Sequence, residues 1–351
     1  MAVTFKEVAE LAGVSTQTVS RVTNGAESVS ATTRNRVLKA IDQLGYVPNK
    51  AAQALKANTK IIGVVSLSMA FHGAAMIANG IRLRAHELGY ATAISAVDNV
   101  CENQIEDAIR ELLGQKVESI IVITPVSTEF AIRLTEKYAK FQLLFIDVPP
   151  HSPVHHVCSA NDQGARLGAK HLLELGRSRF VLITGPEESS SSLVRLDAWK
   201  EEIKAANAKI SAQKKGDWLT PSGYLAMTSV LTQTRDFDAV LVANDQMALG
   251  VMRALHEQGI NVPKDVSVVG FDGTEDSEFF HPPLTTIKQN FTEHGHIAVD
   301  QLLDMKEGSD VLELILDVSL IDRESSSRVD ASVSDTEQVK QLLDQAMRLL
   351  N

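Results

Sequence analysis

The chain has 351 residues, 44% of them hydrophobic and 5% aromatic, with a net charge of −10. This length is too great for one ordinary domain, and the hydrophobic share suffices for large buried cores. The two cysteines, Cys101 and Cys158, exclude a disulfide framework and lack the spacing of a zinc site. The N-terminus has no apolar leader, and no segment approaches the roughly 18 apolar residues of a membrane span. We therefore expect a cytoplasmic protein that does not enter a membrane.

The charge is distributed unevenly along the chain. Residues 1–60 carry eight Lys/Arg and four Asp/Glu, a net charge of +4, so the remainder carries −14. A basic N-terminal segment on an acidic body is expected where only that segment meets a polyanion such as DNA.

Residues 1–46 predict three short helices. Apolar residues at helical spacing form a first helix up to Ala12, and Gly13 allows the tight turn that follows. Ser15 can cap a second helix, and Ser30 and Gly45 suit the two ends of a third. Two short helices joined by a glycine turn predict a helix-turn-helix.

The exposed side of the second helix suits DNA recognition. Gln17 can pair with adenine and Arg21 with guanine in the major groove, while Ser and Thr suit phosphate contacts. This pattern alone leaves a three-helix bundle with a polar face as the alternative.

The N-terminal string VTFKEVAELAGVSTQTVSRVTN, continued by VSATTRNRVLKAIDQLGYVPNKAAQALK, resembles the headpiece of the LacI/GalR family of repressors. The resemblance implies base contacts from Thr16, Gln17 and Arg21. It implies phosphate or backbone contacts from a second set, Thr4, Ser20, Asn24, Ser30, Thr33, Tyr46 and Asn49. Residues 47–60 resemble the family's hinge helix and linker, in which a leucine at the position of Leu55 enters the minor groove and kinks the operator.

From residue 61 onward, short apolar runs alternate with amphipathic segments. We expect strands near 61–68, 90–97, 119–124, 142–148, 179–185, 238–244 and 266–272. We expect helices near 74–88, 102–114, 128–139, 162–175, 194–207, 221–233, 245–258 and 291–306. This alternation predicts an α/β core with two doubly wound, parallel lobes over residues 61–323.

The core carries none of the common catalytic or nucleotide-binding motifs. It has no GxGxxG after the first strand, no P-loop, no HExxH and no GxSxG, and its histidines lack metal-ligand spacing. We therefore expect neither an enzyme nor a metal or cofactor site.

Polar residues follow several predicted strands, at Asp147, Asn244, Asp245 and Asp272. Ligands of open α/β sheets bind beyond the carboxyl ends of the strands. Together with Arg195 and the indoles of Trp199 and Trp218, these groups can hold a polyhydroxylated ligand. The alternative is that each of them caps the next helix, which is the preferred interpretation for Asp245.

Four strings of the core also resemble the same family, whose core is similar to periplasmic sugar-binding proteins. They are GDW (216–218), VANDQMALG (242–250), SVVGFDGTEDS (267–277) and PPLTTIKQ (282–289). The resemblance implies contacts with a sugar effector, best matched by a galactoside, from Asp147, Ser191, Arg195, Trp218, Asn244, Asp272 and Gln289. It places His72, Ile77 and Phe291 at the pocket or between the lobes. Leu67, Ile123 and Ser159 depart from the related pattern of serine, asparagine and phenylalanine, which should alter the recognition of hydroxyl groups.

The C-terminal segment predicts subunit contacts. Residues 324–336 are polar and predict a flexible linker. Within residues 337–351, apolar side chains at Val339, Leu342, Ala346 and Leu349 follow a heptad pattern. A helix this short needs partners, so we expect a homodimer that this segment joins into a homotetramer.

Two hypotheses of function follow. In the first, the protein represses a sugar-utilisation operon by binding a palindromic operator, and a small sugar releases it. In the alternative, a purine-like corepressor closes the same fold and strengthens DNA binding.

Overall fold

The computed structural model describes residues 3–23, 29–46, 60–306, 308 and 310–327. The chain divides into two compact units, Met1–Thr59 and Lys60–Asn351. Several predictions lie outside the described residues: the hinge helix with Asn49 and Leu55, the phosphate or backbone contact of Asn24, and the C-terminal helix over 337–351.

In its described part the first unit holds three helices around a small apolar core. They are α1 (Phe5–Ala12), α2 (Thr16–Thr23) and α3 (Ala31–Leu44). Val8, Val19 and Val37, one from each helix, are fully buried against one another in this core. The helix-turn-helix prediction is confirmed.

The ends of these helices are determined locally, as predicted. Ser15 and Ser30 each accept a hydrogen bond through Oγ from a backbone N–H of the helix that follows, at 3.1 and 3.3 Å. Gly13 and Gly45 have φ angles of 62° and 59°, in the left-handed region that favours glycine.

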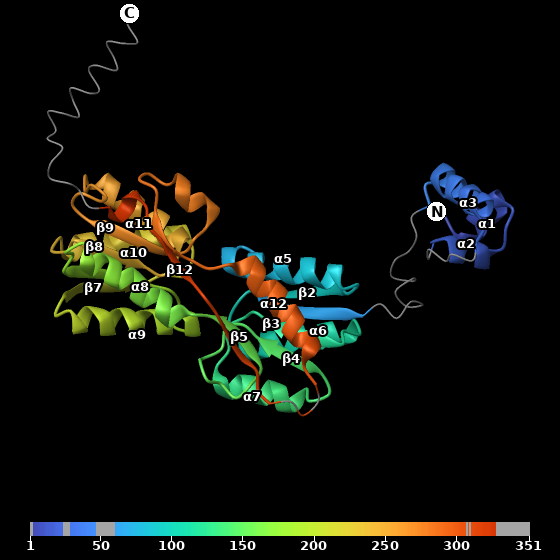
Figure 1. Cartoon of the computed structure of the whole chain (residues 1–351), viewed down its shortest axis with the longest axis horizontal. Helices are drawn as coiled ribbons and strands as arrows, with labels where there is room; N and C mark the ends of the chain where they lie inside the picture. The colour runs from blue at the N-terminus through green and yellow to red at the C-terminus, as the bar shows by residue number, and fades with distance from the viewer. Residues whose placement is uncertain (1–2, 24–28, 47–59, 307, 309, 328–351) are drawn as a thin grey trace, which may run out of the picture. The chain divides into compact units, whose positions relative to one another are not determined.

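The second unit contains two lobes, each built on a six-stranded sheet (Figure 1). The sheet of lobe 1 has the order β11-β5-β4-β3-β1-β2, and its pairs are all parallel. Its strands are β1 (Ile61–Leu67), β2 (Ala91–Val97), β3 (Ser119–Val122), β4 (Gln142–Phe145), β5 (His156–Ser159) and β11 (Glu313–Leu316).

The sheet of lobe 2 has the order β12-β10-β9-β8-β6-β7 and is parallel except for the antiparallel pair β10–β12. Its strands are β6 (Arg179–Thr184), β7 (Lys209–Lys215), β8 (Ala239–Val242), β9 (Ser267–Asp272), β10 (Thr285–Lys288) and β12 (Ser319–Ile321).

Helices cover both faces of the lobe 1 sheet. They are α5 (His72–Glu87), α6 (Glu102–Gly114), α7 (Thr128–Lys137) and α12 (Phe291–Asp304). Successive side chains of a strand point to opposite faces. In β3, Ile120 and Val122 therefore pack with α6 and α7, whereas Ile121 packs with α5 and α12. This is why the strand is a continuous apolar run.

Lobe 2 carries the helices α8 (Asn161–Glu174), α9 (Ser190–Ala205), α10 (Thr220–Gln233) and α11 (Asp245–Glu257), with the short helices η1 (Glu275–Phe279) and η2 (Glu324–Ser326). The chain passes between the lobes at residues 159–161, 288–291 and 316–319. The predicted α/β class with two doubly wound lobes is confirmed. Within the described parts of the chain, no helix is long and apolar enough to cross a membrane.

Five strands were not predicted from the sequence: β5, β7, β10, β11 and β12. The strands β5 and β10 have only four residues each. The strand β7, with the sequence KISAQKK, lies at a sheet edge and is polar and mostly exposed. An edge strand needs no apolar run, and its lysines discourage pairing with another sheet.

The predicted linker over 324–336 begins too early. Ser325 and Ser326 are fully buried. Ser325 Oγ donates to the Val268 carbonyl at 2.6 Å and accepts from the Thr285 N–H at 2.8 Å. Residues 324–327 therefore belong to lobe 2, and their serine-rich composition reflects buried hydrogen bonds.

Candidate functional site

A cavity of about 460 Å³ lies between the carboxyl ends of the two sheets. This volume is typical of small-molecule sites. All ten residues predicted for the effector site line it: His72, Ile77, Asp147, Ser191, Arg195, Trp218, Asn244, Asp272, Gln289 and Phe291. Parallel strands bring them together because their carboxyl ends meet at one edge of each sheet.

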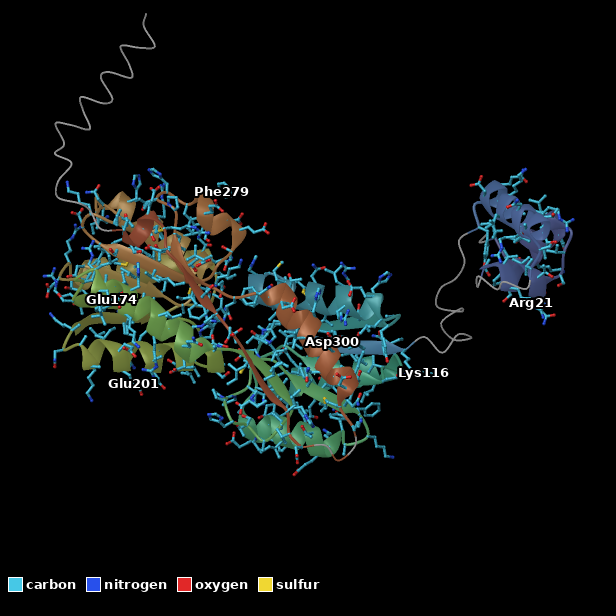
Figure 2. All side chains as sticks on the ribbon, in the orientation of Figure 1. Arg21, Lys116, Glu174, Glu201, Phe279 and Asp300 are labelled. Atoms are coloured by element: carbon cyan, nitrogen blue, oxygen red, sulfur yellow. The ribbon has the colours of Figure 1, made fainter. Side chains whose placement is uncertain are left out.

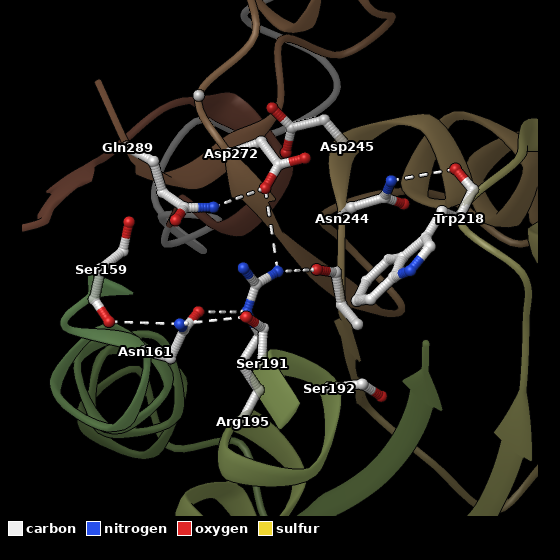
Figure 3. Close-up of polar contacts among 12 residues, drawn as sticks. Ser159, Asn161, Ser191, Ser192, Arg195, Trp218, Asn244, Asp245, Asp272 and Gln289 are labelled. Carbon is white, nitrogen blue, oxygen red and sulfur yellow. Dashed lines mark hydrogen bonds and ion pairs between the residues drawn. The ribbon is translucent and has the colours of Figure 1, made fainter. Parts of the chain in front are cut away.

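Arg195, on α9, is the buried cation of this cavity (Figure 3). Its Nε donates to Asn161 Oδ1 at 2.8 Å, and its Nη1 donates to the Ala243 carbonyl and lies 3.7 Å from Asp272 Oδ1. The guanidinium also stacks 3.6 Å from the centroid of the Phe271 ring. Burial lowers the pKa of Arg195 to about 10, against the attraction of the nearby carboxylates, so the side chain is charged at neutral pH.

Asp272, the last residue of β9, lies beside this cation. Burial raises the pKa of Asp272 to about 8, whereas Arg195 favours the ionised carboxylate and Asp245 opposes it. Gln289 Nε2 donates to Asp272 Oδ1 at 2.8 Å. The φ angle of Asp272 is 117°, a strained conformation for a residue with a side chain. Such strain is common where a carboxylate is aimed into a site.

Asn244 both caps α11 and holds the aromatic wall of the cavity. Its Oδ1 accepts from the Met247 N–H at 2.9 Å, and its Nδ2 donates to the Trp218 carbonyl at 2.9 Å. A Cβ on Gly185 would lie 2.3 Å from the Trp218 ring, so the indole reaches its position only because this residue is glycine. The indole face is thereby available to cover a flat ligand.

The interpretation of Asp245 as a helix cap is wrong. Its side chain is fully buried and accepts hydrogen bonds from the Thr274 N–H at 2.8 Å and Thr286 Oγ1 at 2.6 Å. It thus fixes the segment after β9, while the preceding Asn244 caps the helix. Burial raises the pKa of Asp245 to about 6, and the hydrogen bonds from the two threonines favour the ionised form.

Asp147 connects the two lobes. It follows β4 in lobe 1, and its carboxylate accepts hydrogen bonds from the start of α9 in lobe 2. Ser190 Oγ and the Ser191 N–H donate to Oδ1 at 2.5 and 3.2 Å, and Ser189 Oγ donates to Oδ2 at 2.9 Å. The serine run therefore has a structural partner across the cavity.

Trp199 does not belong to the site. It is only 2% exposed and packs in the core of lobe 2, so its expected proximity to a ligand is wrong. Several lining residues escaped prediction, among them Asn161 and His294. Asn161 orients Arg195, and His294 Nε2 donates to the Val157 carbonyl at 3.0 Å. Asn161 lies where the chain passes between the lobes, and His294 lies on α12, just after the second such passage; no local pattern marks these positions.

In lobe 1 the cavity is bounded by rings and aliphatic groups. The rings of His72 and Phe291 are 6.0 Å apart at their centroids, and Ile77 lies one helical turn beyond His72 on α5. Burial lowers the pKa of His72, although Asp276 and Glu275 oppose this shift. Burial also lowers the pKa of His294 to about 4, so that imidazole is neutral.

The first unit presents the predicted base-reading residues. Thr16, Gln17 and Arg21 are exposed on α2, and Figure 2 shows Arg21 projecting from it. Tyr46 differs from the other predicted DNA contacts because it is 8% exposed and its ring packs 5.4 Å from that of Phe5.

The phosphate-contact candidates Thr4 and Ser30 are exposed at the N-termini of α1 and α3, where backbone N–H groups favour anions. Ser20 and Thr33 are half-buried on α2 and α3.

A helix-turn-helix unit followed by a two-lobed core with a ligand-sized cavity defines a ligand-responsive DNA-binding regulator. Residues 4–49 match the model of bacterial regulatory proteins of the lacI family, and residues 169–326 match that of a periplasmic binding protein-like domain. The chain belongs to the LacI family of bacterial regulatory proteins.

Relatives of known function span nearly the whole chain. The lactose operon repressor of Escherichia coli strain K12 is 40% identical over 92% of this chain and 91% of its own length. The repressor PurR of Vibrio atlanticus is 31% identical, over 88% and 93%. A crystal structure of the lac repressor dimer bound to operator and the anti-inducer ONPF is 39% identical, with a TM-score of 0.82 over 93% of this chain and 99% of that one.

Proposed function

We propose that this chain is a transcriptional repressor of a sugar-utilisation operon, which binds a palindromic operator in the cytoplasm and is released by a small sugar. The observation that carries the proposal is the cavity between the lobes, where Arg195, Asn244, Asp272 and Gln289 converge opposite the Trp218 indole. Carboxylates, amides and a guanidinium bind hydroxyl groups, and an aromatic face covers a sugar ring. The identity to lactose operon repressors supports a galactoside.

The proposed mechanism is a two-state equilibrium of the lobes. A ligand that bridges the lobes changes the equilibrium only through its different affinity for the two arrangements. Residues 47–60 connect the lobes to the DNA-binding unit and would transmit the change. The coupling is reciprocal, so operator binding weakens sugar binding by the same factor.

We assign the base contacts to Thr16, Gln17 and Arg21 and the backbone contacts to the remaining predicted residues of the first unit. The operator-bound dimer of the related protein supports a dimer here, and residues 337–351 would join two dimers into a tetramer. No catalytic role is proposed. The cavity serines donate to Asp147, and the bonds of the described residues bring no imidazole to them as a general base.

Operator release tests the proposal. The full chain is titrated onto a fluorescent palindromic duplex and onto a random duplex, and the complex is then titrated with galactosides, other sugars and purines. We expect tighter binding to the palindrome and release by a sugar. Tighter operator binding with a purine would establish the corepressor alternative, and equal affinity for both duplexes would refute the repressor.

A further inference from the structure

The two lobes offer a ligand very different surfaces. In lobe 2, the cavity is lined by charged and amide groups at the ends of β8, β9 and β10. In lobe 1, the ends of β1, β3 and β4 carry Leu67, Ile123 and Ile146. The pairing of Val65 with Val122 brings the ends of β1 and β3 to the same edge. Leu67 and Ile123 belong to opposite faces of the sheet, since each packs with a different apolar cluster, and both line the cavity where the strands end. We call these two residues the apolar wall.

The carboxylate beside the apolar wall is already engaged. Both oxygens of Asp147 accept hydrogen bonds from the serines at the start of α9, with four distances between 2.5 and 3.3 Å. Ile146, next to it, is 6% exposed and adds to the hydrocarbon surface. A hydroxyl directed at this part of the cavity therefore contacts hydrocarbon, or competes with the four hydrogen bonds that join the lobes at Asp147.

The polar groups of lobe 2 determine how a sugar is oriented. Arg195, Asn244, Asp272 and Gln289 bind its hydroxyl-rich edge, which leaves the opposite edge against lobe 1. Other polar residues of lobe 1 also line the cavity, but Asp98 and Asn99 are exposed and His72 and Ser159 are half-buried, so water can still solvate a hydroxyl beside them. Deeper in the cavity, a hydroxyl on the apolar wall loses its water and gains no partner.

We propose that Leu67 and Ile123 are specificity-determining residues, which select a glycoside whose edge facing lobe 1 carries no hydroxyl. The chemical class is a 6-deoxy sugar or a pentose, in place of the fully hydroxylated hexose. This inference rests on the proposed sugar-released repressor and specifies its effector. An unpartnered buried hydroxyl reduces affinity by a factor on the order of ten to a hundred.

Matched sugar pairs test the inference by isothermal titration calorimetry of the full chain. Methyl β-D-galactopyranoside is compared with its 6-deoxy analogue, methyl β-D-fucopyranoside, and methyl β-D-glucopyranoside with methyl β-D-xylopyranoside. The best sugar from the operator-release panel is compared with its own deoxy analogue. We expect the analogue without the exocyclic hydroxyl to bind at least about tenfold more tightly in the pair that the site accepts.

Substitutions assign the preference to the apolar wall. Leu67→Ser and Ile123→Asn should reduce the ratio of affinities within a pair to about one or reverse it. Leu67→Met, which keeps an apolar side chain of similar volume, should retain the ratio. Ile210→Asn makes the same chemical change on the edge strand β7, outside the cavity, and should also retain it.

The outcomes separate this inference from the proposed function. If sugars bind and release the operator, but the wild-type chain binds both members of each pair within twofold or prefers the hydroxylated one, the apolar-wall inference is overturned and the repressor stands. The same holds if Leu67→Ser and Ile123→Asn fold and leave the wild-type ratio unchanged. If no sugar of the panel binds or releases the operator, the proposed function fails, and the inference fails with it.

Discussion

Replacing Arg195 by methionine tests how far the buried guanidinium organises the effector site. Methionine retains much of the side-chain volume and can still pack on the Phe271 ring, but it removes the charge and every donor. Three acceptors lose a partner: the Asn161 side-chain oxygen, the Ala243 carbonyl and the Asp272 carboxylate.

The magnitude follows from the burial of both partners, since Arg195 is 4% and Asp272 6% exposed. Removing one partner of a buried ion pair costs about 3–5 kcal/mol. Because burial raises the pKa of Asp272 to about 8, its carboxyl can take up a proton, and we expect the lower end, about 3 kcal/mol at pH 7. Because the pKa of Asp272 is raised in the folded state, its protonated carboxyl contributes most to stability below pH 3.8, the ordinary pKa, and this contribution is lost as the pH rises through 8. Because the loss of Arg195 raises the pKa of Asp272 further, the loss in Arg195→Met should be the same at pH 5 and pH 7 and should grow above pH 8, where only the wild-type chain holds a cation beside the ionised carboxylate.

Urea unfolding followed by circular dichroism at pH 5, pH 7 and pH 9 measures this loss, and calorimetry measures sugar binding, which we expect to disappear. Lys204→Met removes a cation from an exposed position of the same helix and serves as the matched control. The double variant Arg195→Met/Asp272→Asn should lose less stability than the two single variants together, because the orphaned carboxylate is gone. Strictly additive losses, or a loss below about 1 kcal/mol at pH 7, would refute the reasoning.

Three further predictions concern other parts of the molecule. Gly185→Ala introduces a Cβ 2.3 Å from the Trp218 ring, so the indole must move at a cost of about 1–3 kcal/mol. We expect this variant to bind sugar at least about tenfold more weakly in calorimetry. Unchanged affinity would show that the indole has no role. Arg21→Ala should weaken operator binding by about 1–3 kcal/mol but barely change binding to a random duplex, as measured by fluorescence anisotropy; equal losses on both duplexes would contradict a base contact. His294→Gln should reduce acid sensitivity. The folded-state pKa of His294 is lowered to about 4 from 6.5, so the wild-type chain loses stability as the pH falls through that window; identical pH profiles of unfolding for both proteins would contradict the assignment.

The local features of this protein were predictable from residue types alone. Helix ends depend on a single residue's conformation or one side-chain bond, which is why Gly13, Ser15, Ser30 and Gly45 gave correct boundaries in the first unit. All seven predicted strands are present, and β1, β3 and β8 were recognisable as continuous apolar runs because they are buried on both faces. The family resemblance identified the ten cavity residues. The position of polar groups at the ends of predicted strands gave the physical reason why some of them should meet at a ligand site.

Tertiary structure decided what depends on neighbours distant in the chain. Asn244 and Asp245 are adjacent and both suit a helix start, yet only the packing of β9 and β10 makes one a cap and the other a buried acceptor. Trp199 and Trp218 differ in the same way: one fills a core, the other lines the cavity. The amino-acid sequence by itself determined where helices, strands and candidate polar groups occur, because these depend on residues within a few positions. Which of those groups share a cavity was decided only when two sheets faced each other, since burial and charge there come from the opposite lobe.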